Sequence, residues 1–158
     1  AMITEAEYSI ISSLPLFGGL ERGVLEGLLE HSQPRNFGKG EMLFHRDDPA
    51  DCFYILFDGW VKIFRESASG DEAVLGVFTG GETVAEAAAF LGRGYPASAQ
   101  AVEDSRVLPV LSGPFRRHLE TMPDVAMNML ASMSKRMHHL VKEVEQLKLL
   151  QSEKFLTQ

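Results

Sequence analysis

The stretch at residues 80–101, GGETVAEAAAFLGRGYPASAQA, places a short helix-forming segment between a glycine turn and a strand-like sequence. Its alanine- and glutamate-rich part is long enough for about two helical turns, and a Gly-Arg-Gly-Tyr-Pro loop leads into alternating small residues. A short helix set into a β structure brings a helix N-terminus and backbone N–H groups inside it, which is a general way to make a ligand-binding concavity. We therefore expect the ligand site here, and we call residues 80–101 the cassette.

The sequence around the cassette predicts a mainly β domain with flanking helices. From residue 35 to about residue 80 the apolar residues recur with a period of two, and the breaks fall at Gly, Asp and Pro. Two more strand-like segments follow the cassette, at 98–102 and 106–111. Short strands at this spacing are typical of an antiparallel barrel or roll.

Helices are expected on both sides of this roll. Thr4 and Glu7 form a capping-box pattern at the start of a helix over 4–14, and helical spacing continues over 20–31. A third short helix is expected over 112–121. Glu82 and Glu86 lie four residues apart, which predicts a shared helical face near a helix N-terminus.

A long helix is expected from Pro123 onward, with apolar residues in alternating steps of three and four. That spacing is a heptad seam, which favours pairing with the same helix of a second chain. The sequence leaves one alternative open, a helix that packs on its own domain. The expected dimer interface consists of Leu130, Met133, Met137, Leu140, Val144 and Leu147.

Composition limits the function classes. The 158 residues fit one domain, and 15 Lys and Arg against 22 Asp and Glu give a net charge of −7. A chain that binds DNA through its phosphates needs a basic face, so this piece alone is not expected to bind DNA. There is no apolar run of about 20 residues and no cleavable leader. The single cysteine, Cys52, excludes an internal disulfide. We expect a cytoplasmic chain that does not contact membranes.

The order of several short motifs resembles the Crp/Fnr superfamily of dimeric bacterial transcription regulators. These motifs are the Phe-Gly-Gly-Leu at 17–20, Gly-Trp-Val-Lys-Ile-Phe at 59–64, Gly70 at a hairpin tip, the cassette and the long helix. The resemblance implies a jelly-roll-like β-roll, a double-stranded β-helix, over 1–122. It also implies a dimerisation helix over 123–158, and a DNA-binding helix-turn-helix domain that lies beyond this chain.

Members of that superfamily that bind cyclic nucleotides carry a Gly-Glu pair, an Arg-Ser pair and a Thr-Ser pair. Here Ala85-Glu86, Tyr95-Pro96 and Leu140-Val141 stand at those places, so that only the glutamate is retained. A cyclic phosphate is bound best by an arginine fork and free N–H groups, whereas Pro96 has no N–H. Cyclic AMP is therefore disfavoured, unless Arg93 substitutes for the missing arginine.

The sequence YPASAQA, preceded by VAEA, is similar to the dissimilative nitrate respiration regulators, the nitric-oxide-responsive branch, some of which work with haem. This resemblance implies an apolar effector pocket, and it leaves haem and an unknown small ligand as alternatives. No pair among the five histidines has a diagnostic spacing, and His138 and His139 are the candidate metal ligands. The expected pocket residues are Ala85, Glu86, Ala89, Arg93, Tyr95, Pro96, Met137, Leu140 and Val141, with Met133 on the same wall.

An enzyme is the other function class that the sequence has to be tested against. Cupin enzymes share small β-rolls, but they need clustered metal-binding His and Glu, and neither an H-x-H pair nor a G-x-S-x-G elbow occurs here. We therefore expect a non-catalytic effector sensor that forms a homodimer and reaches DNA only through the domain beyond this chain. A cyclic-nucleotide-binding regulatory module is the alternative.

Overall fold

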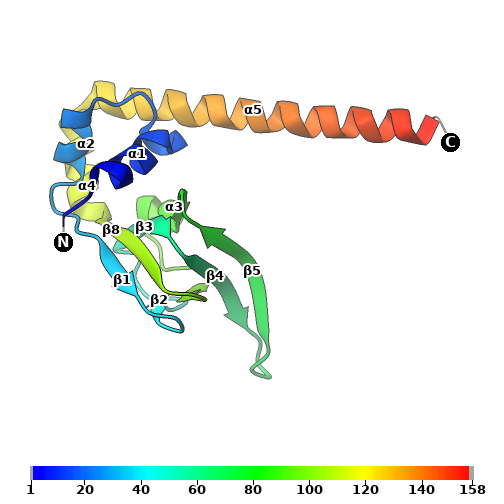
Figure 1. The fold of residues 1–158 in the computed structure, drawn as a ribbon, viewed down its shortest axis with the longest axis horizontal. Helices are drawn as coiled ribbons and strands as arrows, with labels where there is room; N and C mark the ends of the chain where they lie inside the picture. The colour runs from blue at the N-terminus through cyan, green and yellow to red at the C-terminus, as the bar shows by residue number, and fades with distance from the viewer. Residues whose placement is uncertain (1, 157–158) are drawn as a thin grey trace.

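The computed structural model describes residues 2–156 as a β-roll with helices on one side and a long helix that extends beyond it (Figure 1). The roll has two four-stranded sheets in which all paired strands are antiparallel. We call the sheet with the order β1-β8-β3-β6 the first sheet, and the sheet with the order β2-β7-β4-β5 the second sheet. The predicted mainly β-roll is confirmed. The strands are β1 (Arg35–Phe37), β2 (Met42–Phe44), β3 (Cys52–Asp58), β4 (Trp60–Glu66), β5 (Glu72–Thr79), β6 (Glu82–Val84), β7 (Ser98–Ala101) and β8 (Ser105–Leu111).

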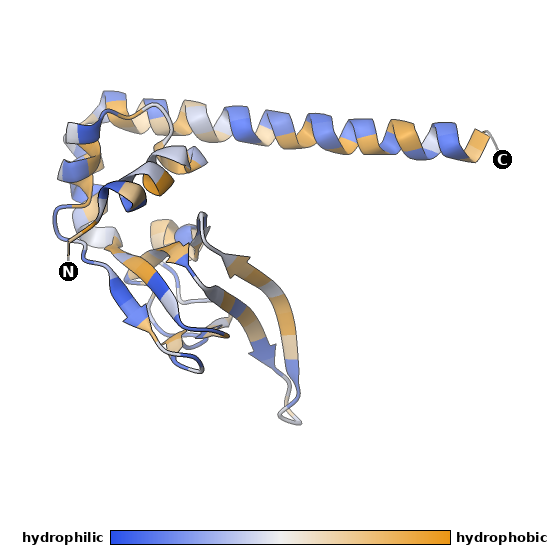
Figure 2. Ribbon diagram, in the orientation of Figure 1, coloured by the Kyte–Doolittle hydropathy of each residue, from blue (hydrophilic) through white to orange (hydrophobic). Residues whose placement is uncertain are grey.

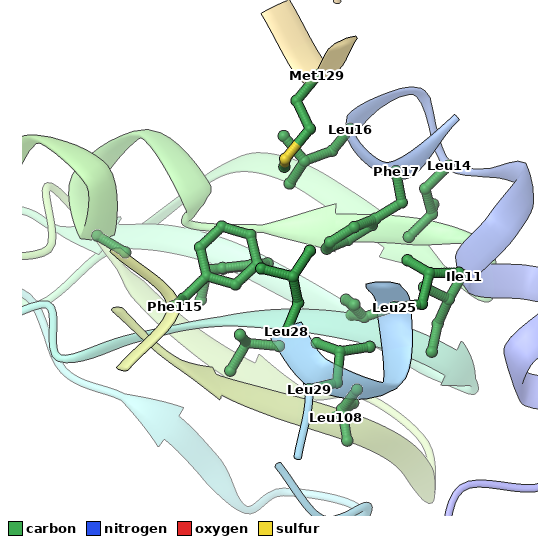
Figure 3. Close-up of a cluster of buried hydrophobic side chains, with 14 of the residues drawn as sticks. Ile11, Leu14, Leu16, Phe17, Leu25, Leu28, Leu29, Leu108, Phe115 and Met129 are labelled. Atoms are coloured by element: carbon green, nitrogen blue, oxygen red, sulfur yellow. The ribbon is translucent and has the colours of Figure 1, made fainter. Parts of the chain in front are cut away.

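Strand β3 is buried on both faces because the first sheet lies between the second sheet and the helices. Phe53, Ile55 and Phe57 belong to the hydrophobic cluster on the helix side. Figure 3 shows this cluster, with Leu108 of the same sheet and Phe115 of a covering helix among its labelled members. Tyr54 and Leu56, which point the other way, belong to the cluster between the two sheets. Side chains alternate across a strand, so burial on both faces explains why this strand is an almost continuous apolar run and does not alternate.

The helix-side cluster is closed by five short helical segments and by the start of the long helix. Phe115 is the centre of its aromatic contacts, with edge-to-face rings at 6.0 Å from Phe17 and 5.5 Å from Phe53. The helices are α1 (Glu5–Ser13), the 3₁₀ turn η1 (Pro15–Phe17), α2 (Arg22–Leu28), α3 (Glu86–Leu91), α4 (Ser112–Glu120) and α5 (Pro123–Leu156). Helix α2 is shorter than the predicted 20–31, and two glycines within it, Gly23 and Gly27, lower its helix propensity.

Helix α1 begins as its sequence predicts and is fixed to the roll by an ion pair. The side chain of Thr4 accepts from the N–H of Glu7 at 3.1 Å, and Glu7 Oε1 accepts from the N–H of Thr4 at 3.0 Å. The same carboxylate is buried against Arg106 of β8, which donates from Nε at 2.6 Å and from Nη2 at 3.2 Å. One side chain therefore caps the helix and joins it to the first sheet.

The long helix α5 contacts the rest of the chain only near its beginning. It packs on η1 and α4 there, and its remaining turns run past the roll, where apolar and polar residues alternate along the ribbon (Figures 1 and 2). The side chains of the six predicted seam residues are between 40% and 69% exposed in the single chain. Within residues 2–156, no helix combines the length and the hydropathy that crossing a membrane requires.

The structure corrects one local prediction. Glu82 lies in strand β6, paired with Leu56 of β3, whereas Glu86 is the first residue of helix α3. The two carboxylates therefore share no helical face. The reason is tertiary, because the edge of the first sheet pairs with residues 82–84 and converts the beginning of a helix-forming stretch into strand.

Candidate functional site

The cassette turns sharply from strand β6 into helix α3 at Ala85. This residue has φ of 66° and ψ of 19°, in the left-handed region, and it precedes the helix without providing a side-chain cap. A residue with a Cβ is strained in this region, where glycine is favoured. The helix ends on Gly92, which is also left-handed. The short helix predicted in the cassette is therefore present, and its entry carries backbone strain.

A cavity of about 250 Å³ lies between α3 and the second sheet, and we call it the roll cavity. The predicted residues Ala85 and Pro96 line it. Within the described chain no charged side chain lines it, so it offers nothing to neutralise a phosphate. The remaining lining residues are Phe44, Ile63, Leu75, Gly76, Phe78, Val84, Ala87, Ala88 and Ala97.

Tyr95 is directed into the protein and does not line the roll cavity. Its side chain is buried, its ring stacks on Phe44 with centroids 3.8 Å apart, and its hydroxyl donates to the carbonyl oxygen of Cys52 at 2.6 Å. Burial, and then the neighbouring Cys52, raise the pKa of the Tyr95 phenol well above its ordinary value. The neutral phenol at this position is a packing and hydrogen-bonding group, and it carries no charge for a ligand.

Neither Arg65 nor Arg93 lines the roll cavity. Arg65 donates from Nε to the carbonyl oxygen of Pro96 at 2.8 Å. No local sequence pattern indicates this contact, because Arg65 lies in β4, 31 residues before its acceptor. Arg93 lines a different hollow, formed with α4. The structure therefore does not place Arg93 where it could replace the missing arginine of the Arg-Ser pair.

A larger concavity, which we call the apolar groove, has a volume of about 580 Å³. It lies where η1, α3, α4 and the first turns of α5 meet. Two of the predicted residues line it, Glu86 of α3 and Met133 of α5, and Glu86 and Thr83 are its polar residues. The sequence did not reveal this groove, because its walls come from four segments distant in the chain. The other lining residues are Leu14, Pro15, Leu16, Ala87, Phe90, Leu119, Ala126, Met129 and Leu130.

The structure does not assemble the predicted pocket within one chain. Met137, Leu140 and Val141 are exposed on the part of α5 that leaves the domain, and they line neither the roll cavity nor the apolar groove. Ala89 is 1% exposed within the helix-side cluster. Ala89 also lines the hollow that Arg93 lines. The predicted set is therefore split among separate sites, because α3 and the later turns of α5 point apart.

The histidines do not form a metal centre. His139 pairs with Glu143 at 2.9 Å along the same helix, and His138 is exposed beside it. Across residues 2–156, no group of three or more His, Cys, Asp or Glu side chains is placed to hold a metal ion. The candidate pair therefore has no third ligand within the described part of one chain.

Comparison with known proteins places this geometry in a family. Residues 34–121 match the family of the cyclic nucleotide-binding domain. The chain is 29% identical over 131 residues to the cyclic AMP receptor protein of Thermus thermophilus. This alignment covers 83% of this chain and 61% of that protein. The chain thus spans less than two thirds of that relative.

Solved structures of transcription regulators have the same fold. DNR from Pseudomonas aeruginosa superposes with a TM-score of 0.81 at 33% identity, covering 93% of this chain and 65% of that one. The sensor domain of the same transcriptional regulator gives a TM-score of 0.70 at 34% identity, covering 85% of this chain and 91% of that one. These relatives are transcription regulators, which agrees with the expectation that the chain is not an enzyme. The chain belongs to the cyclic nucleotide-binding domain family, as a sensor domain of the Crp/Fnr type.

Proposed function

We propose that the chain is the effector-sensing and dimerisation part of a Crp/Fnr-type transcription regulator that does not respond to cyclic AMP. One observation carries the proposal. The cassette carries Ala85, Tyr95 and Pro96 at the places of the family's phosphate-binding residues, and the adjoining roll cavity has no charged lining. A cyclic nucleotide there would lose the hydration of its phosphate without gaining a cation, which is strongly unfavourable.

The apolar groove is the proposed effector site. Its volume of about 580 Å³ lies within the range of about 300–1,000 Å³ typical of pockets for cofactor-sized ligands. The roll cavity, at about 250 Å³, falls below that range. Ten of the twelve residues that line the groove are apolar, which suits a flat apolar effector.

Haem is the candidate effector. The donor set of the groove fits, because Met129 and Met133 both line it and the methionine thioether is one of the usual axial ligands of haem iron. The histidines line no part of the groove. When bound, haem iron would supply a coordination position for a diatomic gas such as nitric oxide. The chain's own contribution is to exclude water from the apolar faces of the ring and to offer a thioether sulfur.

The position of the groove suggests how binding reaches the rest of a regulator. Its walls include α3 of the cassette and Ala126, Met129 and Leu130 of α5. A ligand there touches the helix that we propose to pair with a second chain. It shifts the equilibrium between two arrangements of that pair if it binds one of them more tightly. The DNA-reading domain would lie outside this chain, as the greater length of its relatives suggests.

Titration calorimetry tests the nucleotide part of the proposal. Cyclic AMP and cyclic GMP should bind no more tightly than about 1 mM, which corresponds to about −4 kcal/mol. Micromolar binding of cyclic AMP that disappears in Arg93→Ala would instead favour the cyclic-nucleotide-binding module. The cyclic AMP receptor of Thermus thermophilus among the relatives makes that the second candidate.

Two matched pairs of variants test the groove. Ala126 lines the groove and Ala131 is exposed outside it, so Ala126→Trp should reduce haem uptake at least tenfold whereas Ala131→Trp should not. Met133→Leu conserves volume but removes the sulfur, so it should change the Soret band. Met137→Leu, outside the groove, should leave the band unchanged. Haem uptake that is indifferent to Ala126→Trp in a folded variant would place the effector site elsewhere.

A further inference from the structure

A hollow of about 590 Å³ lies on the surface away from both the roll cavity and the apolar groove, and we call it the arginine hollow. Three segments enclose it, namely the loop between β2 and β3, the loop after α3, and the first turns of α4. Arg93, Arg116 and Arg117 line it from the second and third of these segments. Asp47 and Asp51 line it from the first. Three arginines thus line one concavity in a chain with a net charge of −7.

Within residues 2–156, these three arginines form no ion pair. Arg116 donates from Nη2 to the carbonyl oxygen of Phe90 at 2.6 Å, which holds it against the end of α3. The side chains of Arg93 and Arg117 have no partner among the residues described. The two aspartates of the hollow lie beyond 4.0 Å from all three guanidinium groups. By contrast, Arg22 and Arg106 elsewhere in the chain are paired with carboxylates.

Arg117 lies close to the N-terminus of its own helix. A Cβ at Gly113 would be 3.4 Å from Arg117 Nη1, so the guanidinium lies back over the first turn of its own helix. That turn is the positive end of α4, and no side chain caps it because Leu111 stands at the cap position. A cation beside an uncapped helix N-terminus is repelled. An anion between them would be attracted to both.

We propose that the arginine hollow binds a small oligophosphate anion, held by the guanidinium groups of Arg93, Arg116 and Arg117. Guanidinium groups bind phosphate oxygens in bidentate fashion, and several of them around one concavity suit a ligand with more than one phosphate. Gly92 also lines the hollow, and a Cβ there would meet nothing within 4 Å, so the absence of a side chain leaves its backbone open to a ligand. Asp47 and Asp51 limit the affinity by repulsion, and they disfavour an extended acidic polypeptide that would cross that loop.

Calorimetry with pyrophosphate at low salt tests the proposal. Wild-type chain should bind it with a Kd in the micromolar range, and Arg93→Gln or Arg117→Gln should each weaken binding about tenfold. Arg46→Gln is the matched control, because Arg46 is exposed, has no side-chain partner and lies outside the hollow. Its effect should be less than about twofold. Asp47→Asn should tighten binding, and asparagine tolerates the left-handed φ of 72° at this position.

Three results would overturn the proposal. They are pyrophosphate binding no tighter than about 1 mM, an equal loss of affinity in Arg46→Gln, and capture of a polyglutamate peptide through Arg93 and Arg117 when pyrophosphate is not bound. The side chains of Arg93 and Arg117 form no hydrogen bond or ion pair with the residues described. Thermal melting of both variants should therefore match wild type. These outcomes are independent of the apolar groove, where neither arginine lies.

Discussion

The hydroxyl of Tyr95 donates a 2.6 Å hydrogen bond to the carbonyl oxygen of Cys52, which joins the loop of the cassette to the beginning of strand β3. This bond and the stacking on Phe44 hold the phenol in the core between the sheets. Tyr95, which the family resemblance matches to a phosphate-binding arginine, is therefore part of the packing. A single arginine substitution at Tyr95 would bury an unpaired charge, so it would not restore a phosphate site.

The hydrogen bond of Tyr95 should contribute measurably to stability. Tyr95→Phe removes the donor and should lower the free energy of unfolding by about 1 kcal/mol in urea titrations. Tyr54→Phe is the matched comparison, because the hydroxyl of Tyr54 is also buried but donates to Leu43 at 3.3 Å. Tyr54→Phe should therefore lower the free energy of unfolding by less than Tyr95→Phe does. An unchanged midpoint for Tyr95→Phe would show that water replaces the bond.

Backbone strain at Ala85 should make glycine the more stable residue there. Ala85→Gly relieves a left-handed conformation that costs about 1–2 kcal/mol for a residue with a Cβ, against about 0.5–1 kcal/mol of added chain entropy. We expect a net gain of a few tenths to about 1 kcal/mol. Ala88→Gly, in the middle of α3, should instead destabilise by about 1 kcal/mol. Thermal melting of the two variants should shift in opposite directions.

The ion pair between Glu7 and Arg106 should make stability depend on acidity. Burial alone would raise the pKa of Glu7, but the hydrogen bonds from Arg106 and Thr4 together hold this pKa below its ordinary value of 4.5. A carboxyl whose pKa is lowered by folding stabilises the fold above the unfolded value. That contribution is fully present above about pH 4.5 and is lost as the pH falls through the folded pKa.

Glu7→Gln should therefore be less stable than wild type at neutral pH, by about 1–2 kcal/mol, and the difference should shrink below pH 4. Glu5→Gln is the control, since Glu5 pairs with Arg22 on the surface and that contribution should vanish in high salt. Denaturant unfolding between pH 3 and pH 7 measures both. A constant difference between wild type and Glu7→Gln across this range would contradict the assignment.

The exposed seam of α5 predicts a dimer. Leu140→Lys or Met137→Lys places a charge in the proposed helix pair, and either should weaken association by more than tenfold in sedimentation velocity. Gln146→Lys adds the same charge outside the seam and should leave the dimer intact. A wild-type chain that stays monomeric at high micromolar concentration would contradict the prediction and favour a helix that remains single.

Much of the fold was predictable because it depends on local patterns. The capping box of Thr4 and Glu7, the alternation in β4, Pro123 at the first position of α5 and the glycine that ends α3 are each determined by residues within a few positions. Strand β6 was missed because its pairing partner, β3, lies more than 20 residues away. Local preference there favoured a helix.

The features of the candidate sites likewise divide into those set by local sequence and those set by tertiary packing. The sequence alone determined that Tyr95 and Pro96 stand side by side in the cassette and that α5 carries a heptad seam, because both follow from residue identity and spacing. Only the tertiary structure decided that Tyr95 is directed into the core, that Arg93 lines one hollow with Arg116 and Arg117, and that Met133 and Phe90 line the apolar groove. Concavities are made by segments far apart in the chain, and side-chain direction at their walls depends on how helices and sheets pack, which no local pattern encodes.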